Sequence, residues 1–180
     1  GGILMLWEFL KEKMLSRPSS KMQEEDANIT YEEAVIFAES FGKKLRTPCC
    51  AILCQSELAA ALALLSCFAA GVTAVPLSFR YGEAHCKRIL RKIRPSAMIT
   101  DVGGELRVLH LDIAEKKQGT LEEWPAAILC TSGTTGEPKG VMLSEENFLT
   151  NIRDICKYFK IEETDRILIC RPLYHCAVLT

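Results

Sequence analysis

The sequence shows no excess of either charge, no metal-ligand spacing and no long hydrophobic run. Its 22 basic and 23 acidic residues leave a formal net charge of -1, which gives no reason to expect a nucleic-acid partner or an anionic membrane surface. Only 3 histidines accompany 9 cysteines, and no two cysteines form a C-x-x-C pair, so a zinc site is not favoured. The apolar stretch at residues 58–70 is far shorter than the roughly 20 residues that span a bilayer. We therefore expect no metal site, no nucleic-acid partner and no transmembrane segment.

Secretion signals are missing too. The first residues lack a basic n-region and a small-residue cleavage site, and apolar residues recur at helical spacing between Ile3 and Leu15, which predicts a docking helix. The odd number of cysteines is typical of reduced core thiols in a cytoplasmic protein. Several of them stand inside apolar runs, namely Cys50, Cys54, Cys67, Cys130 and Cys170. The sequence gives no indication of the oligomeric state.

From Cys49 onward the sequence alternates between strand and helix patterns. Strands are predicted at residues 49–54, 72–75 and 97–100, and helices at 56–70 and 83–94. The β-α-β-α-β succession from Cys49 to Thr100 requires right-handed parallel crossovers. It predicts an α/β fold with a layered, mostly parallel sheet and flanking helices. A turn at residues 102–105 predicts that residues 106–111 add a hairpin strand to this sheet.

Capping residues mark the helix starts and ends. Thr30 followed by Glu33 is a capping box, which predicts a helix directly after Thr30. Ser56 predicts the start of the next helix, and Gly71 predicts its end. Residues 17–28 are polar and predict a linker or surface loop.

Basic residues gather toward the end of the helix predicted at residues 83–94. They are Lys87, Arg88, Arg91, Lys92 and Arg94. Cations at a helix end complement the helix dipole and form a solvated face. A nucleic-acid surface is the alternative, which a chain without net positive charge does not favour.

The run from Thr131 to Gly140 has the composition of an anion-binding loop. It holds three glycines, four hydroxyls and one lysine directly after the apolar run 126–130. Glycines let backbone N–H groups turn toward a ligand, and the hydroxyls and the Lys139 ammonium can donate to phosphate oxygens. The alternative is a solvent-exposed Gly/Thr turn. The common P-loop is excluded, because Pro138 occupies the position of its second glycine and no hydroxyl follows Lys139.

Strand and helix patterns resume after this loop. Residues 141–143 predict a strand, Ser144 predicts the start of a helix at 145–160, and residues 166–170 predict a further strand. One face of that helix is apolar and is expected to line the core. It comprises Phe148, Ile152, Ile155, Cys156 and Phe159.

The run from Thr131 to Val141 resembles, almost residue for residue, the phosphate-loop signature of the adenylate-forming enzymes. These include the acyl-CoA synthetases, the adenylation domains of peptide synthetases and luciferase. Residues 29–31, 70–77 and 172–175 resemble further landmarks of the family in the same order. The resemblance implies that residues 1–180 are the N-terminal portion of an adenylation domain and an incomplete part of the adenylate-forming fold. The acidic ribose-binding residue, the aromatic adenine platform and the catalytic lysine of the C-terminal domain would lie outside it.

The resemblance also implies a reaction and a set of site residues. Family members join a carboxylic acid to ATP with Mg²⁺, and a thiol such as coenzyme A then attacks the acyl-adenylate. The residues implied for the ATP phosphates are Thr131, Ser132, Gly133, Thr134, Thr135, Gly136 and Lys139. Lys139 and His175 are the implied catalytic residues, with His175 nearer the carboxylate. On the residues alone, His175 is a core or strand-end histidine.

The function predicted on this basis is that of an AMP-forming carboxylate-CoA ligase, with the 180-residue chain inactive by itself. The substrate is expected to have an uncharged tail, because Cys176 stands where amino-acid-activating relatives carry an aspartate. The alternatives are an adenylation domain for amino acids or for acyl carriers, and a non-catalytic nucleotide-binding module.

Overall fold

A six-stranded sheet organises the chain in the computed structural model, which describes residues 5–112, 124–131 and 136–170. The strands are β3 (Cys49–Leu53), β4 (Thr73–Pro76), β5 (Ala97–Thr100), β6 (Arg107–His110), β7 (Ala127–Thr131) and β8 (Lys139–Leu143). Their order across the sheet is β6-β5-β3-β4-β7-β8. The four central strands run parallel, while β6 and β8 are antiparallel to their neighbours. The predicted α/β fold class with a mostly parallel sheet is confirmed.

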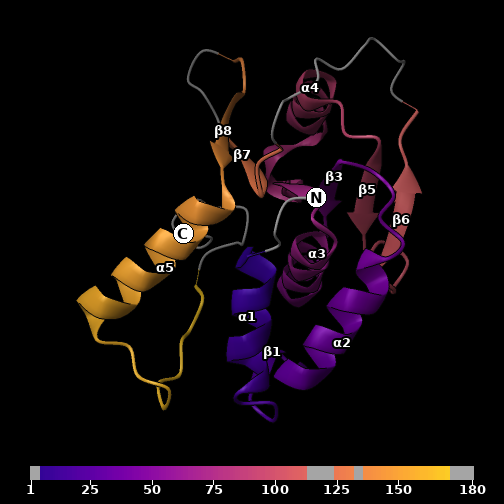
Figure 1. Ribbon diagram of the computed structural model, residues 1–180. Coiled ribbons are helices and arrows are strands. Elements are labelled where there is room, and N and C mark those ends of the chain that lie inside the picture. The colour runs from indigo at the N-terminus through magenta and orange to yellow at the C-terminus, as the bar shows by residue number, and fades with distance from the viewer. Residues whose placement is uncertain (1–4, 113–123, 132–135, 171–180) are drawn as a thin grey trace.

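Helices cover both faces of this sheet. They are α1 (Met5–Leu15), α2 (Tyr31–Gly42), α3 (Glu57–Ala70), α4 (Glu83–Ile93) and α5 (Glu145–Phe159), with the short 3-10 helix η1 (Phe79–Tyr81) before α4. In Figure 1, α4 lies on one side of the sheet, and α1, α2, α3 and α5 lie on the other.

Side chains alternate between the two core clusters along β3. Cys50 and Ile52 belong to the cluster that contains the buried residues of α1, α2 and α3, whereas Cys49 and Ala51 join Ile89 of α4. Successive strand residues point to opposite faces, so a strand covered on both sides must be apolar throughout. The sequence Cys49–Leu53 meets this requirement, with four of its positions fully buried.

The capping residues act as the sequence predicts. Thr30 Oγ1 accepts the N–H of Glu33, and the Glu33 carboxylate accepts the N–H of Thr30. Ser56 Oγ accepts the N–H of Ala59 at the start of α3. Gly71 ends that helix at φ 67°, a left-handed conformation that favours glycine.

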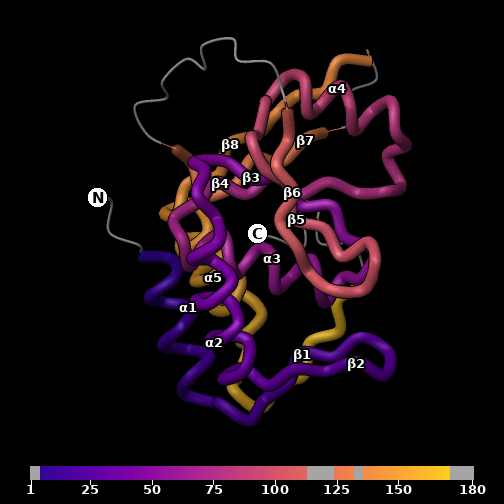
Figure 2. The backbone as a smooth tube through the Cα atoms, turned by 90° about the vertical axis from the view of Figure 1, so that its right-hand side faces the viewer, coloured from indigo at the N-terminus to yellow at the C-terminus, as the bar shows by residue number. Residues whose placement is uncertain are grey.

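Residues 17–28, for which a linker or surface loop was predicted, lie partly in a β-hairpin. They contain β1 (Lys21–Glu24) and, running on to Thr30, β2 (Ala27–Thr30), a small antiparallel hairpin apart from the main sheet (Figure 2). The strands are short and largely exposed, so they carry no apolar alternation that a sequence pattern can detect. The hairpin brings Glu24 Oε2 to the first turn of α3, where it accepts the N–H groups of Glu57 and Leu58 at 2.6 and 3.1 Å.

Two predictions for the C-terminal third are wrong. Only the first part of the α5 face is buried, through Phe148 and Leu149, whereas Ile155, Cys156 and Phe159 are exposed. Residues 166–170 form no strand, and Ile167, Leu168 and Ile169 are exposed as well. Apolar strands need a partner strand for their backbone groups, and no described strand pairs with this segment. An apolar surface on α5 and residues 167–169 is therefore left uncovered.

The cysteines divide into core and surface groups. Cys49, Cys50, Cys67, Cys86 and Cys130 are buried and Cys54 is partly buried, as expected of core thiols. Cys170 is exposed, contrary to the prediction, because the strand that would bury it does not form. Burial raises the pKa of the Cys49 thiol to about 12, and such a thiol is inert because only the thiolate is nucleophilic.

We expect brief alkylation of the native chain with iodoacetamide at pH 8 to modify Cys156 and Cys170 and to spare Cys49. Peptide mapping by mass spectrometry measures the modified fraction at each site. Alkylation in denaturant serves as the control, since every thiol should then react. Rapid modification of Cys49 in the folded chain would contradict the described core.

Candidate phosphate-binding site

The candidate site is the hairpin formed by β7 and β8. These strands pair in antiparallel register, with Thr131 opposite Lys139 and Cys130 opposite Gly140. The predicted loop residues Ser132, Gly133, Thr134 and Thr135 lie outside the described residues, and so does His175. The structure therefore shows the two arms of the hairpin, and it brings Thr131, Gly136 and Lys139 to the same end of it.

Lys139 is the first residue of β8 rather than a loop residue. Its side chain and that of Thr131 are exposed, and Thr131 Oγ1 donates to the Lys139 carbonyl at 3.3 Å. None of the ion pairs among the described residues involves Lys139. Its ammonium is therefore available to an anion held at the end of the hairpin.

Gly136 adopts a left-handed conformation with φ 81°. A Cβ atom built on it meets no other atom within 4 Å, so the backbone conformation and not space favours glycine here. Left-handed residues within a tight turn allow successive N–H groups to face one side, which is how backbone nests bind anions. The position is consistent with the predicted phosphate role.

Two residues from the neighbouring η1–α4 segment contact the base of the loop. Lys92 Nζ donates to the carbonyl of the buried Pro138 at 2.7 Å, and Tyr81 Oη donates to the carbonyl of Cys130 at 3.2 Å. Sequence reasoning missed both, since it assigned Lys92 to a solvated helix face together with four other basic residues. Helical spacing alone does not show which of those cations reaches the hairpin.

The residue before the hairpin turn is a neutral thiol. Burial raises the pKa of Cys130 to about 11, and the Lys92 cation acts in the opposite direction. At neutral pH this thiol is protonated, so it contributes packing and not a nucleophile. The described side-chain donors at this end of the hairpin are the Lys139 ammonium and the Thr131 hydroxyl, which already donates to the Lys139 carbonyl.

This donor set suits phosphate oxygens. Hydroxyls and ammonium groups donate hydrogen bonds to anionic oxygens, while Mg²⁺ requires oxygen ligands and is commonly held through substrate phosphates. Within the described ranges, no group of three or more His, Cys, Asp or Glu residues could hold a metal ion. The described donors are thus of the kind that an anionic oxygen accepts from.

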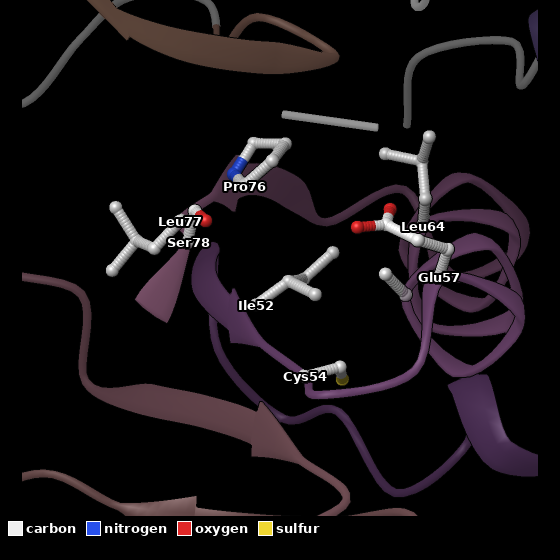
Figure 3. A pocket seen from close by; sticks show the side chains of 8 residues that line it. Ile52, Cys54, Glu57, Leu64, Pro76, Leu77 and Ser78 are labelled. Carbon is white, nitrogen blue, oxygen red and sulfur yellow. The ribbon is translucent and has the colours of Figure 1, made fainter. Parts of the chain in front are cut away.

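A small cavity elsewhere does not compete for this role. It measures about 20 Å³ and lies between β3, β4 and the start of α3, lined by residues such as Ile52, Glu57 and Pro76 (Figure 3). Small-molecule sites occupy roughly 300–1,000 Å³. The N–H groups of Glu57 and Leu58 at this end of α3 are already taken by Glu24.

Not one of the helices lying in residues 5–112 or 136–170 combines the length and apolar character needed to cross a bilayer.

The fold matches solved adenylating enzymes. O-succinylbenzoate coenzyme A synthetase (MenE) from Bacillus subtilis, solved in complex with AMP, superposes with a TM-score of 0.75 at 24% identity, over 96% of this chain and 51% of that chain. Residues 11–180 match the family model described as AMP-binding enzyme. The chain therefore belongs to the AMP-binding enzyme family, and the resemblance drawn from the phosphate loop is confirmed at that level.

Curated relatives include synthetases with different names and lengths. A hybrid PKS-NRPS synthetase of Fusarium sp. (strain FN080326) is 31% identical over 124 residues, which are 59% of this chain and 3% of that protein. The feruloyl-CoA synthase of Amycolatopsis sp. is 30% identical over 132 residues, or 64% of this chain and 27% of that protein. The chain thus spans about half of the matched structure and about a quarter or less of these relatives.

Proposed function

We propose that the protein to which this chain belongs is an AMP-forming carboxylate-CoA ligase, in which the β7–β8 hairpin binds the phosphates of ATP. The observation that carries the proposal is the arrangement of Thr131, Gly136 and Lys139 at one end of a hairpin in a chain of the AMP-binding enzyme family. Ser132, Gly133, Thr134 and Thr135 complete the proposed phosphate site.

The reaction has two steps. A carboxylate oxygen attacks the α-phosphorus of ATP, the bond to pyrophosphate breaks, and an acyl-adenylate forms. The sulfur of coenzyme A then attacks the acyl carbon, the thiol loses its proton, and AMP leaves with the bonding electrons. In the first step negative charge grows on the departing pyrophosphate, so donors fixed in advance around it lower the barrier.

The chain's own residues act on that charge. The ammonium of Lys139 is exposed and is proposed to donate to pyrophosphate oxygens. The Thr131 hydroxyl, which donates to the Lys139 carbonyl in the structure, is proposed to turn to a pyrophosphate oxygen when ATP binds, and Mg²⁺ bound to the nucleotide would neutralise part of the same charge. His175 is proposed to lie nearer the carboxylate. The nucleotide base and the ribose would be held by parts of the protein outside residues 1–180.

The similar proteins differ in what their names indicate about the thiol that accepts the acyl group. The name of feruloyl-CoA synthase supports coenzyme A, while the hybrid PKS-NRPS synthetase supports the alternative of a synthetase adenylation domain. We favour an uncharged acid because Cys176 provides no carboxylate for a substrate ammonium, and coenzyme A because of the similarity to feruloyl-CoA synthase. A buried ammonium without a partner would cost several kcal/mol.

We expect the complete protein to release pyrophosphate with fatty or aryl acids and not with amino acids. The measurement is a coupled pyrophosphate assay over a panel of acids matched in size, with and without coenzyme A. The absence of pyrophosphate release with every acid, together with retained ATP binding, would favour a non-catalytic nucleotide-binding module. Preference for an amino acid would show that the interpretation of Cys176 is wrong.

A further inference from the structure

We propose that Lys92 and Tyr81 are positioning residues for the phosphate-binding hairpin, holding its two arms at the width and orientation that a polyphosphate requires. This inference rests on the proposed phosphate role of the hairpin. Neither residue belongs to the loop, and both come from the segment that packs on the opposite side of the sheet from α1, α2 and α3.

The two contacts fall on the two different arms of the hairpin. Tyr81 Oη donates to the carbonyl of Cys130, directly before Thr131, and Lys92 Nζ donates to the carbonyl of Pro138, directly before Lys139. Thr131 and Lys139 are opposite each other in the ladder. Tyr81 therefore contacts the peptide unit that joins Cys130 to Thr131, and Lys92 contacts the one that joins Pro138 to Lys139.

Because peptide units are planar, these two hydrogen bonds also restrict the directions of the Thr131 and Lys139 side chains. Each peptide unit is planar and almost always trans, so a hydrogen bond to the Pro138 carbonyl restricts the plane that leads into Lys139. The same argument applies to the Cys130 carbonyl and Thr131. The Thr131 hydroxyl bond to the Lys139 carbonyl then ties the two arms to each other.

The Lys92 contact differs from those of the other basic residues of α4. Lys87 pairs with Glu83 one turn earlier in the same helix, and Arg94 Nε donates to the carbonyl of Arg91. Lys92 instead reaches from α4 to residue 138, and its cation lies close enough to Cys130 to oppose the rise of that thiol pKa. A long, flexible side chain loses rotamer freedom in such a contact, so an exposed lysine needs a compensating bond to stay there.

Four variants of the 180-residue chain test the proposal, with Mg²⁺-pyrophosphate as the probe in calorimetric titration. Lys92→Met removes the donor and the charge, Lys92→Arg keeps both, and Tyr81→Phe removes a donor without changing charge. Lys87→Met is the matched control, since it removes an exposed cation from the same helix. We expect binding to weaken about fivefold in Lys92→Met and in Tyr81→Phe, the size of one lost hydrogen bond, and to stay within about twofold of the unaltered chain in the other two.

Amide hydrogen exchange in residues 131–140, measured without ligand, separates the two possible roles. A residue that only contacts the phosphate would not change the exchange rate in the absence of ligand. Exchange should be faster in Lys92→Met and Tyr81→Phe than in Lys87→Met, because the arms lose their supports. Unchanged exchange in both variants would overturn the positioning role, and so would pyrophosphate affinity equal to that of the unaltered chain. If Lys139→Ala also leaves the affinity unchanged, or if the unaltered chain binds no pyrophosphate, the proposed phosphate role of the hairpin is wrong, and the positioning role falls with it.

Discussion

Replacement of Lys139 by alanine is expected to weaken Mg²⁺-ATP binding by about 10- to 100-fold, the loss of one hydrogen bond to a charged group. Lys139 begins β8 with an exposed side chain, and it takes part in none of the ion pairs among the described residues. Truncation therefore removes a donor to the ligand without breaking a contact within the fold. Titration of the chain with Mg²⁺-ATP measures the dissociation constant.

Two controls separate a specific contact of Lys139 from a general effect of positive charge: the dependence of binding on ionic strength and the variant Lys87→Ala. Binding by the unaltered chain should weaken as ionic strength rises, since the Debye length falls from about 10 Å at 0.1 M to about 3 Å at 1 M. The Lys139→Ala chain should respond less steeply. Lys87→Ala removes an exposed cation from α4 and should leave the affinity unchanged. Equal dissociation constants for Lys139→Ala and the unaltered chain, with the same thermal unfolding midpoint, would rule out the phosphate role.

Gly136 shows how far the loop could be predicted from sequence. The sequence indicates a glycine-rich anion loop, and the structure shows that Gly136 has the positive φ that such a loop requires. Composition predicts this because only glycine adopts that conformation without strain. Composition does not predict that Lys139 already belongs to a strand, since a strand start depends on which residues of the opposite arm pair with it.

The local signals in the rest of the chain were the most reliable. Thr30, Ser56 and Gly71 each act within four residues of their own position, so the sequence contains everything that their contacts need. The alternation from Cys49 to Thr100 was equally clear, because a strand buried on both faces must be apolar. These two kinds of signal determine most of the sheet and its helices.

Contacts between residues far apart in the chain could not be predicted from the sequence. Lys92 and Pro138 are 46 positions apart, and Glu24 and Glu57 are 33 positions apart. Which lysine of α4 reaches the hairpin depends on how that helix is placed on the sheet. Which carboxylate caps α3 depends on the exposed β1–β2 hairpin, whose polar strands carry no pattern.

The error at residues 166–170 has a different cause. The apolar run Ile167, Leu168 and Ile169 has a strand pattern, yet these residues are exposed and unpaired in the described structure. A strand is stabilised by its partner, so a correct local pattern is not enough where none of the described strands is available. The uncovered surface of α5 and residues 167–169 shows that the folded chain leaves part of its apolar surface without cover.

The 180-residue chain alone is expected to catalyse no measurable ATP-pyrophosphate exchange with any carboxylic acid. The hairpin is proposed to supply phosphate donors, but the cavity between β3, β4 and α3 measures about 20 Å³ and is too small for a nucleotide or an acid. Holding two reactants in attack geometry contributes roughly 7–11 kcal/mol of barrier lowering. The chain spans 51% of the matched structure, and the family resemblance implies that the ribose and adenine contacts lie outside it. The assay follows labelled pyrophosphate into ATP on a monodisperse fraction, since the uncovered apolar surface favours self-association. The complete protein with the same acids is the positive control, and robust exchange by the homogeneous 180-residue chain would show that these residues enclose a working site after all.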